Sequence, residues 1–505
     1  MNSEARAQNR PDHNKNVASP ARRRIIAVAI PLIVGIGMAL LPPPAGLQQY
    51  SWWYLSLFIA VIIGLVTEPL PGAAIGLLGV AVAATLGKFV LFSPAQLATH
   101  GFSAPNHAVA WALSGFSNTI VWLIAAAFIF AVGYEKTGLG RRIALWLLSK
   151  LGGRPLTLGY AVMIADLVLA PFMPSNTARS AGSIYPVIKN IPEFYQSLPN
   201  DPSARRIGSF LMWVAIASTS VTSSMFLTGL APNVFVVAVA RTTLHVNISW
   251  TQWFLGFLPV GIILLLATPL LTYILYPPEV KRSPEIPAWA KTELAKMGRL
   301  SRKEIVLLVL VCFGLVLWIF GASFVDATTV ALLVVSLLVV TGTVGWNDII
   351  GNKPAFNTLL WFGTLVALAS GLASTGVVAW LAGLFGPALT SLKPLWGLMG
   401  LVALFFLIHY LFASLTAHAA ALLPVMLTIA GKIPGLPPLA VALAFGMTLG
   451  IMGILTPYGT GPAPVYAGSG FLPSSDYWRL GAIFGFFFLI VFLVVGVPYL
   501  FYCVH

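Results

Sequence analysis

Charged side chains are scarce in this chain. Lys, Arg, Asp and Glu together make up 8% of its 505 residues, whereas a soluble domain ordinarily carries about 25%. Hydrophobic residues reach 58%, and apolar runs of roughly 17–25 residues recur, which is the length of a membrane-spanning helix. The composition therefore excludes a set of soluble domains. It predicts an all-α polytopic membrane protein that contacts the lipid bilayer.

Cysteine is nearly absent as well. Cys312 and Cys503 lie in apolar runs far apart in the sequence, so neither a disulfide framework nor a CxxC metal site is available. The HExxH, GxSxG and Walker A strings of proteases, hydrolases and ATPases are also missing. The histidines lack metal-ligand spacing, and no loop is long enough for an ATPase domain. We therefore expect no enzyme activity, no metal and no cofactor.

Acidic residues are half as frequent as basic ones, 14 against 28, which leaves a net charge of +14. The sequence does not predict nucleic-acid binding, because Lys and Arg cluster in short loops between apolar runs, where positive charge marks the cytoplasmic side. The basic tail 1–24 lacks the apolar core of a signal peptide. We expect a cytoplasmic N-terminus and a location in the cell inner (plasma) membrane. An organellar transit peptide is the alternative.

Two short polar stretches, Pro174–Arg179 (PSNTAR) and Ala413–His418 (ASLTAH), interrupt the apolar pattern. Each lies between apolar segments that are too short to cross a bilayer singly. Each is therefore predicted to be the tip of a re-entrant hairpin, the first over about 156–190 and the second over about 394–432. Ser, Thr and Asn cap helix N-termini, and the free N–H groups and dipole at such an end favour an anion.

The chain contains an internal repeat, which four pairs of matching segments reveal. In the first three pairs the two members are 239 residues apart, and in the last pair they are 232 residues apart. They are Asn118–Trp122 with Asn357–Trp361, Ser175 with Ser414, Arg179 with His418, and Thr228–Pro232 with Thr460–Pro464. The Ser117-Asn118-Thr119 string copies the tip motif, but it begins an ordinary span, so we expect it to cap a helix.

The two repeats are inverted in the membrane. The loop after the span that begins at Asn118 carries five Lys or Arg, whereas the equivalent loop of the second repeat carries only Lys393. We predict about eleven transmembrane helices plus the two hairpins. The predicted order is a cytoplasmic tail (1–24), a first helix and loop (25–51), a first repeat (52–276), a cytoplasmic linker (277–303) and a second repeat (304–504). Inverted repeats with broken helices are typical of secondary transporters.

The strings PSNTARSAG, SLTAH and Thr460–Pro464 resemble the divalent anion/sodium symporter (DASS) family. The branch they resemble contains citrate/succinate and tartrate/succinate antiporters and 2-oxoglutarate/malate translocators. The resemblance extends over nearly the whole chain after residue 24. It implies a homodimer of the elevator type, in which a fixed scaffold domain holds a moving transport domain with both hairpins and both broken helices. It also implies exchange of di- or tricarboxylates such as citrate, succinate, malate, tartrate or 2-oxoglutarate.

The resemblance also implies a substrate site. The predicted binding residues are Ser175, Asn176, Thr177, Arg179, Thr228 and Gly229 in the first repeat, and Ser414, Thr416, His418, Thr460, Gly461 and Pro462 in the second. Family symporters have Ser-Asn-Thr at both tips, but here the second tip carries Leu415 in place of the amide. A hard cation such as sodium prefers oxygen ligands, so we predict antiport. Sodium-coupled symport is the first alternative, and an anion channel or uniporter is the second.

Several side-chain roles stay open. Arg179 either holds a substrate carboxylate bidentately, pairs with Asp166, or reaches the cytoplasm. If it is unpaired, its buried charge hinders the empty carrier from crossing the membrane and makes exchange obligatory. His418, with an ordinary pKa of about 6.5, either changes charge with pH or is a neutral histidine bonded to a carbonyl. The Thr-Gly breaks either bind substrate or serve packing, and Glu135 and Lys136 are expected to form a local or interfacial pair.

Overall fold

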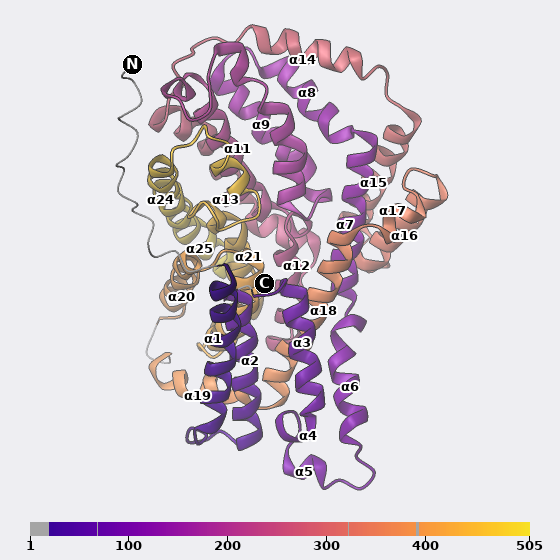
Figure 1. Ribbon diagram of the computed structural model, residues 1–505, viewed down its shortest axis with the longest axis vertical. Helices are drawn as coiled ribbons and strands as arrows, with labels where there is room; N and C mark the ends of the chain where they lie inside the picture. The colour runs from indigo at the N-terminus through magenta and orange to yellow at the C-terminus, as the bar shows by residue number, and fades with distance from the viewer. Residues whose placement is uncertain (1–19, 68, 322, 390–392, 505) are drawn as a thin grey trace, which may run out of the picture.

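A computed structural model describes residues 20–67, 69–321, 323–389 and 393–504. Every regular element in these ranges is helical (Figure 1), which confirms the predicted all-α class. The first 19 residues of the predicted tail 1–24 lie outside the described ranges.

The main helices form one series before residue 277 and a second series after it. The first series is α1 (Pro20–Leu40), α2 (Gln49–Thr67), α3 (Gly72–Thr85), α6 (Ala104–Ser114), α7 (Thr119–Thr137), α8 (Leu139–Leu151), α9 (Pro155–Leu169), α11 (Gly208–Met225), α12 (Ala231–Thr243) and α13 (Trp250–Leu275). The second series is α14 (Glu285–Lys296), α15 (Arg302–Phe320), α16 (Ala327–Val340), α17 (Trp346–Ile350), α18 (Lys353–Ser374), α19 (Val377–Leu389), α20 (Pro394–Ile408), α21 (Leu415–Ala430), α22 (Pro438–Ile451), α23 (Ala463–Ala467), α24 (Ser474–Val491) and α25 (Val497–Cys503).

Eight helical stretches in the described ranges are long and apolar enough to cross a membrane, and five shorter apolar helices accompany them. The protein is therefore a multi-pass membrane protein. Two of the eight, Pro155–Phe172 and Pro394–Leu411, are the first arms of the predicted hairpins. At 18 residues each, they are longer than the sequence suggested, because a 3-10 turn extends each arm toward its tip.

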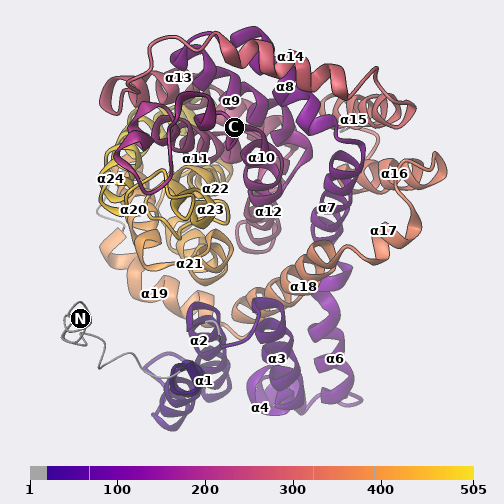
Figure 2. The same ribbon diagram turned by 45° about the horizontal axis from the view of Figure 1, so that its top comes forward.

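The helices pack into two groups (Figure 2). The first group contains α1–α3, α6, α7 and α15–α18, with α18 packed against both α3 and α7. The second group contains α9, α11–α13 and α20–α24, and so holds both hairpins and both broken helices. The groups meet mainly where α12 lies against α7 and α18, and also where α21 contacts α2 and where α13 contacts α15. Helices α8 and α14 pack together at one end of the molecule (Figure 1).

Local sequence explains where the key elements begin and end. Asn118 caps α7, because its side-chain oxygen accepts a hydrogen bond from the Ile120 amide at 2.9 Å, which confirms the capping role predicted for this string. Gly138 ends α7 in the left-handed region at φ 74°, where glycine carries no Cβ penalty. At the first break, α11 ends at Met225 and α12 restarts with Pro232 in its first turn, a position that proline favours.

The linker 277–303 is more ordered than its prolines and charges suggested. It contains α14, whose Ile286 and Ala290 are fully buried, and this helix packs against α8. The two residues are four apart and therefore share one face of the helix. A small apolar stripe is thus enough to hold a mostly charged segment against the amphipathic helix α8.

Candidate functional site

A cavity of about 290 Å³ lies between the two hairpin tips and the two helix breaks. Seven of the twelve predicted site residues line it: Ser175, Asn176, Thr177, Ser414, Thr416, Thr460 and Gly461. The apolar part of the wall was not predicted to bind: Pro174, Ala413 and Leu230–Pro232 belong to the predicted tips and break, whereas Phe128 of α7 left no signal in the sequence. Leu415 completes this apolar part. The cavity therefore combines hydroxyl and amide groups from both repeats with an apolar wall.

The first tip is bonded to the break of the opposite repeat. The side-chain amide of Asn176 donates to Thr460 Oγ1 at 2.8 Å. Gly461 lies so close to the first tip that a Cβ built on it would overlap Thr177 Oγ1. Only glycine permits this approach. The pseudo-symmetric motifs thus meet in space, although 284 residues separate Asn176 from Thr460.

The first tip is also bonded to the break of its own repeat. The Ala231 amide donates to the Pro174 carbonyl at 2.9 Å, and Thr228 Oγ1 donates to the Pro171 carbonyl at 2.5 Å. Ser175 Oγ accepts from the Ala178 amide at 3.2 Å, and a π-helical segment, Thr177–Ile184, follows. Such segments are frequent at functional sites. The first tip is therefore bonded to the breaks of both repeats.

Arg179 lies behind the first tip and is completely buried. Its Nε donates to Asp166 Oδ2 at 3.1 Å, and its Nη1 donates to the carbonyl oxygens of Met173 at 2.8 Å and Gly229 at 2.7 Å. Its Nη2 donates to the hydroxyls of Thr219, Thr222 and Ser223. Of the open alternatives, this is the pairing with Asp166. Arg179 does not line the cavity, and the protein itself occupies the hydrogen-bonding groups that a bidentate carboxylate contact needs.

His418 lies behind the second tip and is also completely buried. Its ring packs against Phe405 at 4.3 Å, Phe412 at 5.0 Å and His409 at 5.1 Å between ring centroids. Neither ring nitrogen has a hydrogen-bond partner among the described residues. The histidine that contacts a carbonyl is instead His409, whose Nε2 lies 2.9 Å from the Gly459 oxygen.

The two repeats differ in charge at these equivalent positions. Phe405 follows Asp166 by the same 239 residues that separate His418 from Arg179. A buried ion pair in the first repeat is therefore replaced by a histidine against a phenyl ring in the second. Of the remaining predicted residues, Thr228, Gly229 and Pro462 are not among those that line the cavity, and their direct contact with a ligand stays a prediction.

The cavity opens toward one end of the molecule. A larger cavity of about 830 Å³ shares Phe128, Ser175 and Thr177 with it. This vestibule, as we call it, extends to Glu135 and Lys136 at the end of α7 and to Asn347–Asn352 around α17. Lys136 does not pair with Glu135, because its Nζ lies 2.6 Å from Asp348 Oδ1.

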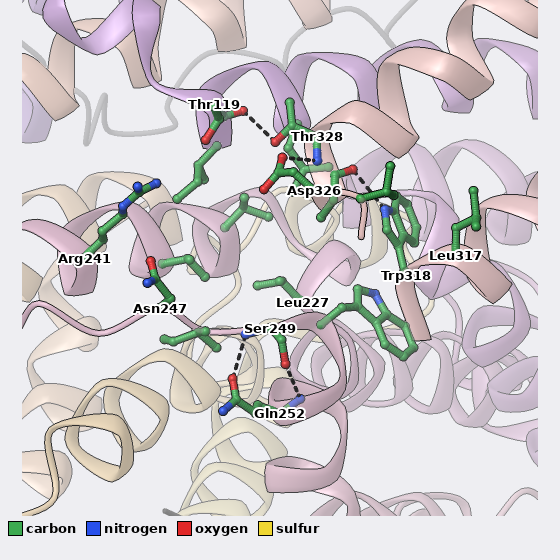
Figure 3. A pocket seen from close by; sticks show the side chains of 18 residues that line it. Thr119, Leu227, Arg241, Asn247, Ser249, Gln252, Leu317, Trp318, Asp326 and Thr328 are labelled. Carbon is green, nitrogen blue, oxygen red and sulfur yellow. Dashed lines mark hydrogen bonds between the residues drawn. The ribbon is translucent and has the colours of Figure 1, made fainter. Parts of the chain in front are cut away.

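A third pocket, of about 440 Å³, lies at the opposite end of α7 (Figure 3). Arg241 lies on one side of this pocket, and Asp326 and Trp318 lie on the other. It shares no lining residue with the tip cavity or the vestibule. In this structure the tip cavity therefore communicates with the vestibule and not with the Arg241 pocket. The vestibule lies where α7 leads into α8 and where α17 follows α16, and we call this the α8–α17 end of the molecule.

The chain matches known transporters over most of its length. The family described as the sodium:sulfate symporter transmembrane region matches residues 22–504. The L-tartrate/succinate antiporters of Escherichia coli and Shigella sonnei are each 48% identical to it, over 92% of this chain and 96% of theirs.

Two solved structures share the fold. One is the YdaH transporter of Alcanivorax borkumensis, with a TM-score of 0.57 and 13% identity over 90% of this chain and 98% of that one. The other is MtrF of Neisseria gonorrhoeae, with a TM-score of 0.56 and 14% identity over 94% and 98%. At this identity the likeness concerns the fold alone.

Proposed function

Because the chain belongs to the sodium:sulfate symporter transmembrane region family, we propose that it exchanges dicarboxylate anions across the membrane by antiport. The identity of 48% with L-tartrate/succinate antiporters supports anion:anion exchange over sodium symport and over a channel or uniporter. Succinate and tartrate are the first substrates to test, and malate, 2-oxoglutarate and the tricarboxylate citrate follow.

The observation that carries the proposal is the cavity between the two tips. Ser175, Thr177, Ser414 and Thr416 bring hydroxyls from opposite repeats to one cavity, and hydroxyls and helix N-termini donate hydrogen bonds to carboxylates. A molecule with a carboxylate at each end fits two sets of donors on opposite sides. Leu415 and Phe128 then face its carbon skeleton.

The surroundings of Arg179 support independence from sodium. Six protein oxygens accept hydrogen bonds from its guanidinium: one carboxylate, two carbonyls and three hydroxyls. Oxygen ligands of these kinds are what a hard cation requires. The guanidinium occupies this oxygen cage permanently, so the first repeat carries its own cation. In the second repeat, Leu415 stands in place of the asparagine of the tip motif and so removes one amide oxygen. His418 occupies the position equivalent to Arg179.

Obligatory exchange does not follow from an unpaired buried charge on Arg179, as the sequence alone suggested, because Asp166 compensates that charge. The polar lining of the tip cavity supplies the reason instead. Without substrate, the Ser and Thr hydroxyls of both tips lose their carboxylate partners, and polar groups moved through the membrane interior without hydrogen bonds cost free energy.

We further propose that the second helix group, which holds the hairpins, moves as the transport domain against the first group, the scaffold, in a homodimer. For the division of the chain we propose a first inverted repeat over 52–276, a linker over 277–303 and a second inverted repeat over 304–504. Arg141, Arg142 and Lys150 on α8 favour a cytoplasmic position for the α8–α17 end. The vestibule then opens to the cytoplasm, and the N-terminus is cytoplasmic in the inner membrane.

Counterflow into proteoliposomes tests the proposal. Vesicles loaded with succinate should accumulate labelled tartrate or succinate, whereas empty vesicles should not. A conductance or net flux without internal substrate would support the channel instead. Replacing the internal acid by malate, citrate or 2-oxoglutarate then defines the exchanged pair.

A further inference from the structure

We propose that Lys136 is the cation that the carboxylate substrate meets in the vestibule, and that Asp348 competes with the substrate for it. This inference rests on the proposed function, and it assigns a substrate-positioning role to residues outside the tips. It concerns the step in which an anion enters or leaves the site from the α8–α17 end.

The lining of the two connected cavities supports the assignment. Among the described residues that line the tip cavity and the vestibule, Lys136 is the one cationic side chain. Arg179 is completely buried and bonded to protein oxygens, and His418 is buried behind the second tip. A dianion leaving Ser175 and Thr177 through the shared opening at Phe128 therefore meets positive charge first at Lys136.

The geometry leaves Lys136 able to change partners. It lies in the last turn of α7, and its side chain is 48% exposed, whereas that of Asp348 is 23% exposed. Asp348 is fixed, because its Oδ2 accepts a hydrogen bond from the Gly345 amide at 2.8 Å and completes the cap of α17. Lysine carries its charge on a flexible stem. The ammonium can therefore turn toward an anion while Asp348 stays in place.

Electrostatics explain why Asp348 and the substrate compete for Lys136. The hydrogen bond from Lys136 and the Gly345 amide lower the pKa of Asp348 below its ordinary value, so Asp348 stays charged at neutral pH. Partly exposed ion pairs are weak, and a dianion offers Lys136 two negative charges. Glu135, exposed beside it, repels the same dianion. Lys136 thus offsets a local negative charge that otherwise opposes substrate on this face.

Sided transport measurements test this inference. Exchange is measured in inside-out and right-side-out membrane vesicles, so that the bath concentration of succinate addresses one face at a time. Lys136→Gln should raise the half-saturation concentration roughly two- to fivefold on the vestibule face, the size of one partly screened charge interaction, and leave the opposite face unchanged. Lys136→Arg should stay near wild type. Asp348→Asn should lower the half-saturation concentration on the vestibule face.

Arg141→Gln is the matched control. Arg141 forms a similar ion pair at the same end of the molecule, with Glu293 at 2.9 Å, but it lines neither cavity. Its loss should leave both faces unchanged. The effect of Lys136→Gln should also shrink at high salt, because added salt screens exposed charges.

Two results would overturn the inference. One is an equal change on both faces, and the other is no change on either face in a variant that still exchanges succinate. A wild-type protein that shows no exchange at all contradicts the proposed function instead, so the two failures are distinguishable.

Discussion

At the level of single residues, a buried charge is tolerated only when its surroundings compensate it, and Arg179 illustrates the requirement. Asp166 neutralises the guanidinium, and carbonyl and hydroxyl oxygens accept its remaining N–H groups. Two of these oxygens belong to Met173, which directly precedes the tip, and to Gly229 in the first break. The arginine therefore fixes the position of the tip whether or not it ever contacts substrate.

We expect Arg179→Ala to destabilise the protein by about 3–5 kcal/mol, because it leaves Asp166 buried without a partner. The thermal unfolding temperature in detergent measures this. The double variant Asp166→Asn with Arg179→Gln removes both charges and should recover much of the stability without recovering exchange. A stable Arg179→Ala protein that is impaired only in substrate affinity would favour a carboxylate contact instead.

His418 is not expected to make exchange depend on pH. Its imidazole is completely buried, lies outside the tip cavity and has no hydrogen-bond partner among the described residues, and such burial disfavours the charged form. The pH profile of exchange should therefore be the same in a His418→Gln variant, and a different profile would show that the histidine titrates. Substrate protonation confuses the measurement, so the pH profile between roughly 5.5 and 8 must be compared with that of His418→Gln. Identical profiles would assign the pH dependence to the substrate and leave His418 a structural role.

Among the helical elements, each hairpin tip is built from the same motif, yet the elements behind the tips differ. The first tip continues as a π-helical segment that contains Arg179, whereas the second continues directly as the α-helix α21 with Ser414 as its cap. Asp166 and Phe405 occupy equivalent positions on the first arms. The repeat thus preserves the tips and breaks while the charge behind them has diverged.

This relation predicts the outcome of a charge transplant. His418→Arg alone places a charge against Phe405 and Phe412 without a carboxylate partner, and it should destabilise the protein. The same substitution combined with Phe405→Asp recreates the pair of the first repeat and should recover stability. Unfolding temperatures of the two variants decide the matter. No recovery in the double variant would show that the second hairpin lacks the oxygen cage found around Arg179.

The contact between Gly461 and the first tip gives another prediction. Gly461→Ala should abolish exchange, because the added methyl overlaps Thr177 Oγ1 and pushes the first tip away from the second break. Gly400→Ala is the control, since a Cβ at that exposed position in α20 meets nothing within 4 Å. Full exchange by a correctly inserted Gly461→Ala protein would contradict the described approach of the two motifs.

Much of this element-level organisation is predictable because it depends on local chemistry. Ser, Asn, Pro and Gly mark caps and breaks through their own backbone preferences, and the repeat doubles each signal. Contacts between distant residues leave no such local trace. The pairing of Lys136 with Asp348 and the apolar wall at Phe128 depend on how α7 packs against other elements. The packing of α14 on α8 likewise depends on two apolar residues in a charged segment.

In the molecule as a whole, the helices form two groups that meet mainly where α12 contacts α7 and α18. The tip cavity lies across this boundary, because Phe128 belongs to one group and the tips belong to the other. The vestibule opens at the α8–α17 end. An alternating-access cycle requires the opposite opening as well. Movement of the hairpin group past Phe128 would supply it.

The most direct test of sodium-independent antiport is counterflow of labelled succinate with sodium as the variable. Proteoliposomes loaded with succinate should take up the label equally in sodium, potassium or choline buffers, and empty vesicles should take up almost none. This is the result expected if Arg179 occupies its six oxygen partners and the carrier must return with an anion bound. Strong sodium-stimulated uptake into empty vesicles would contradict sodium-independent antiport and identify a sodium-coupled symporter.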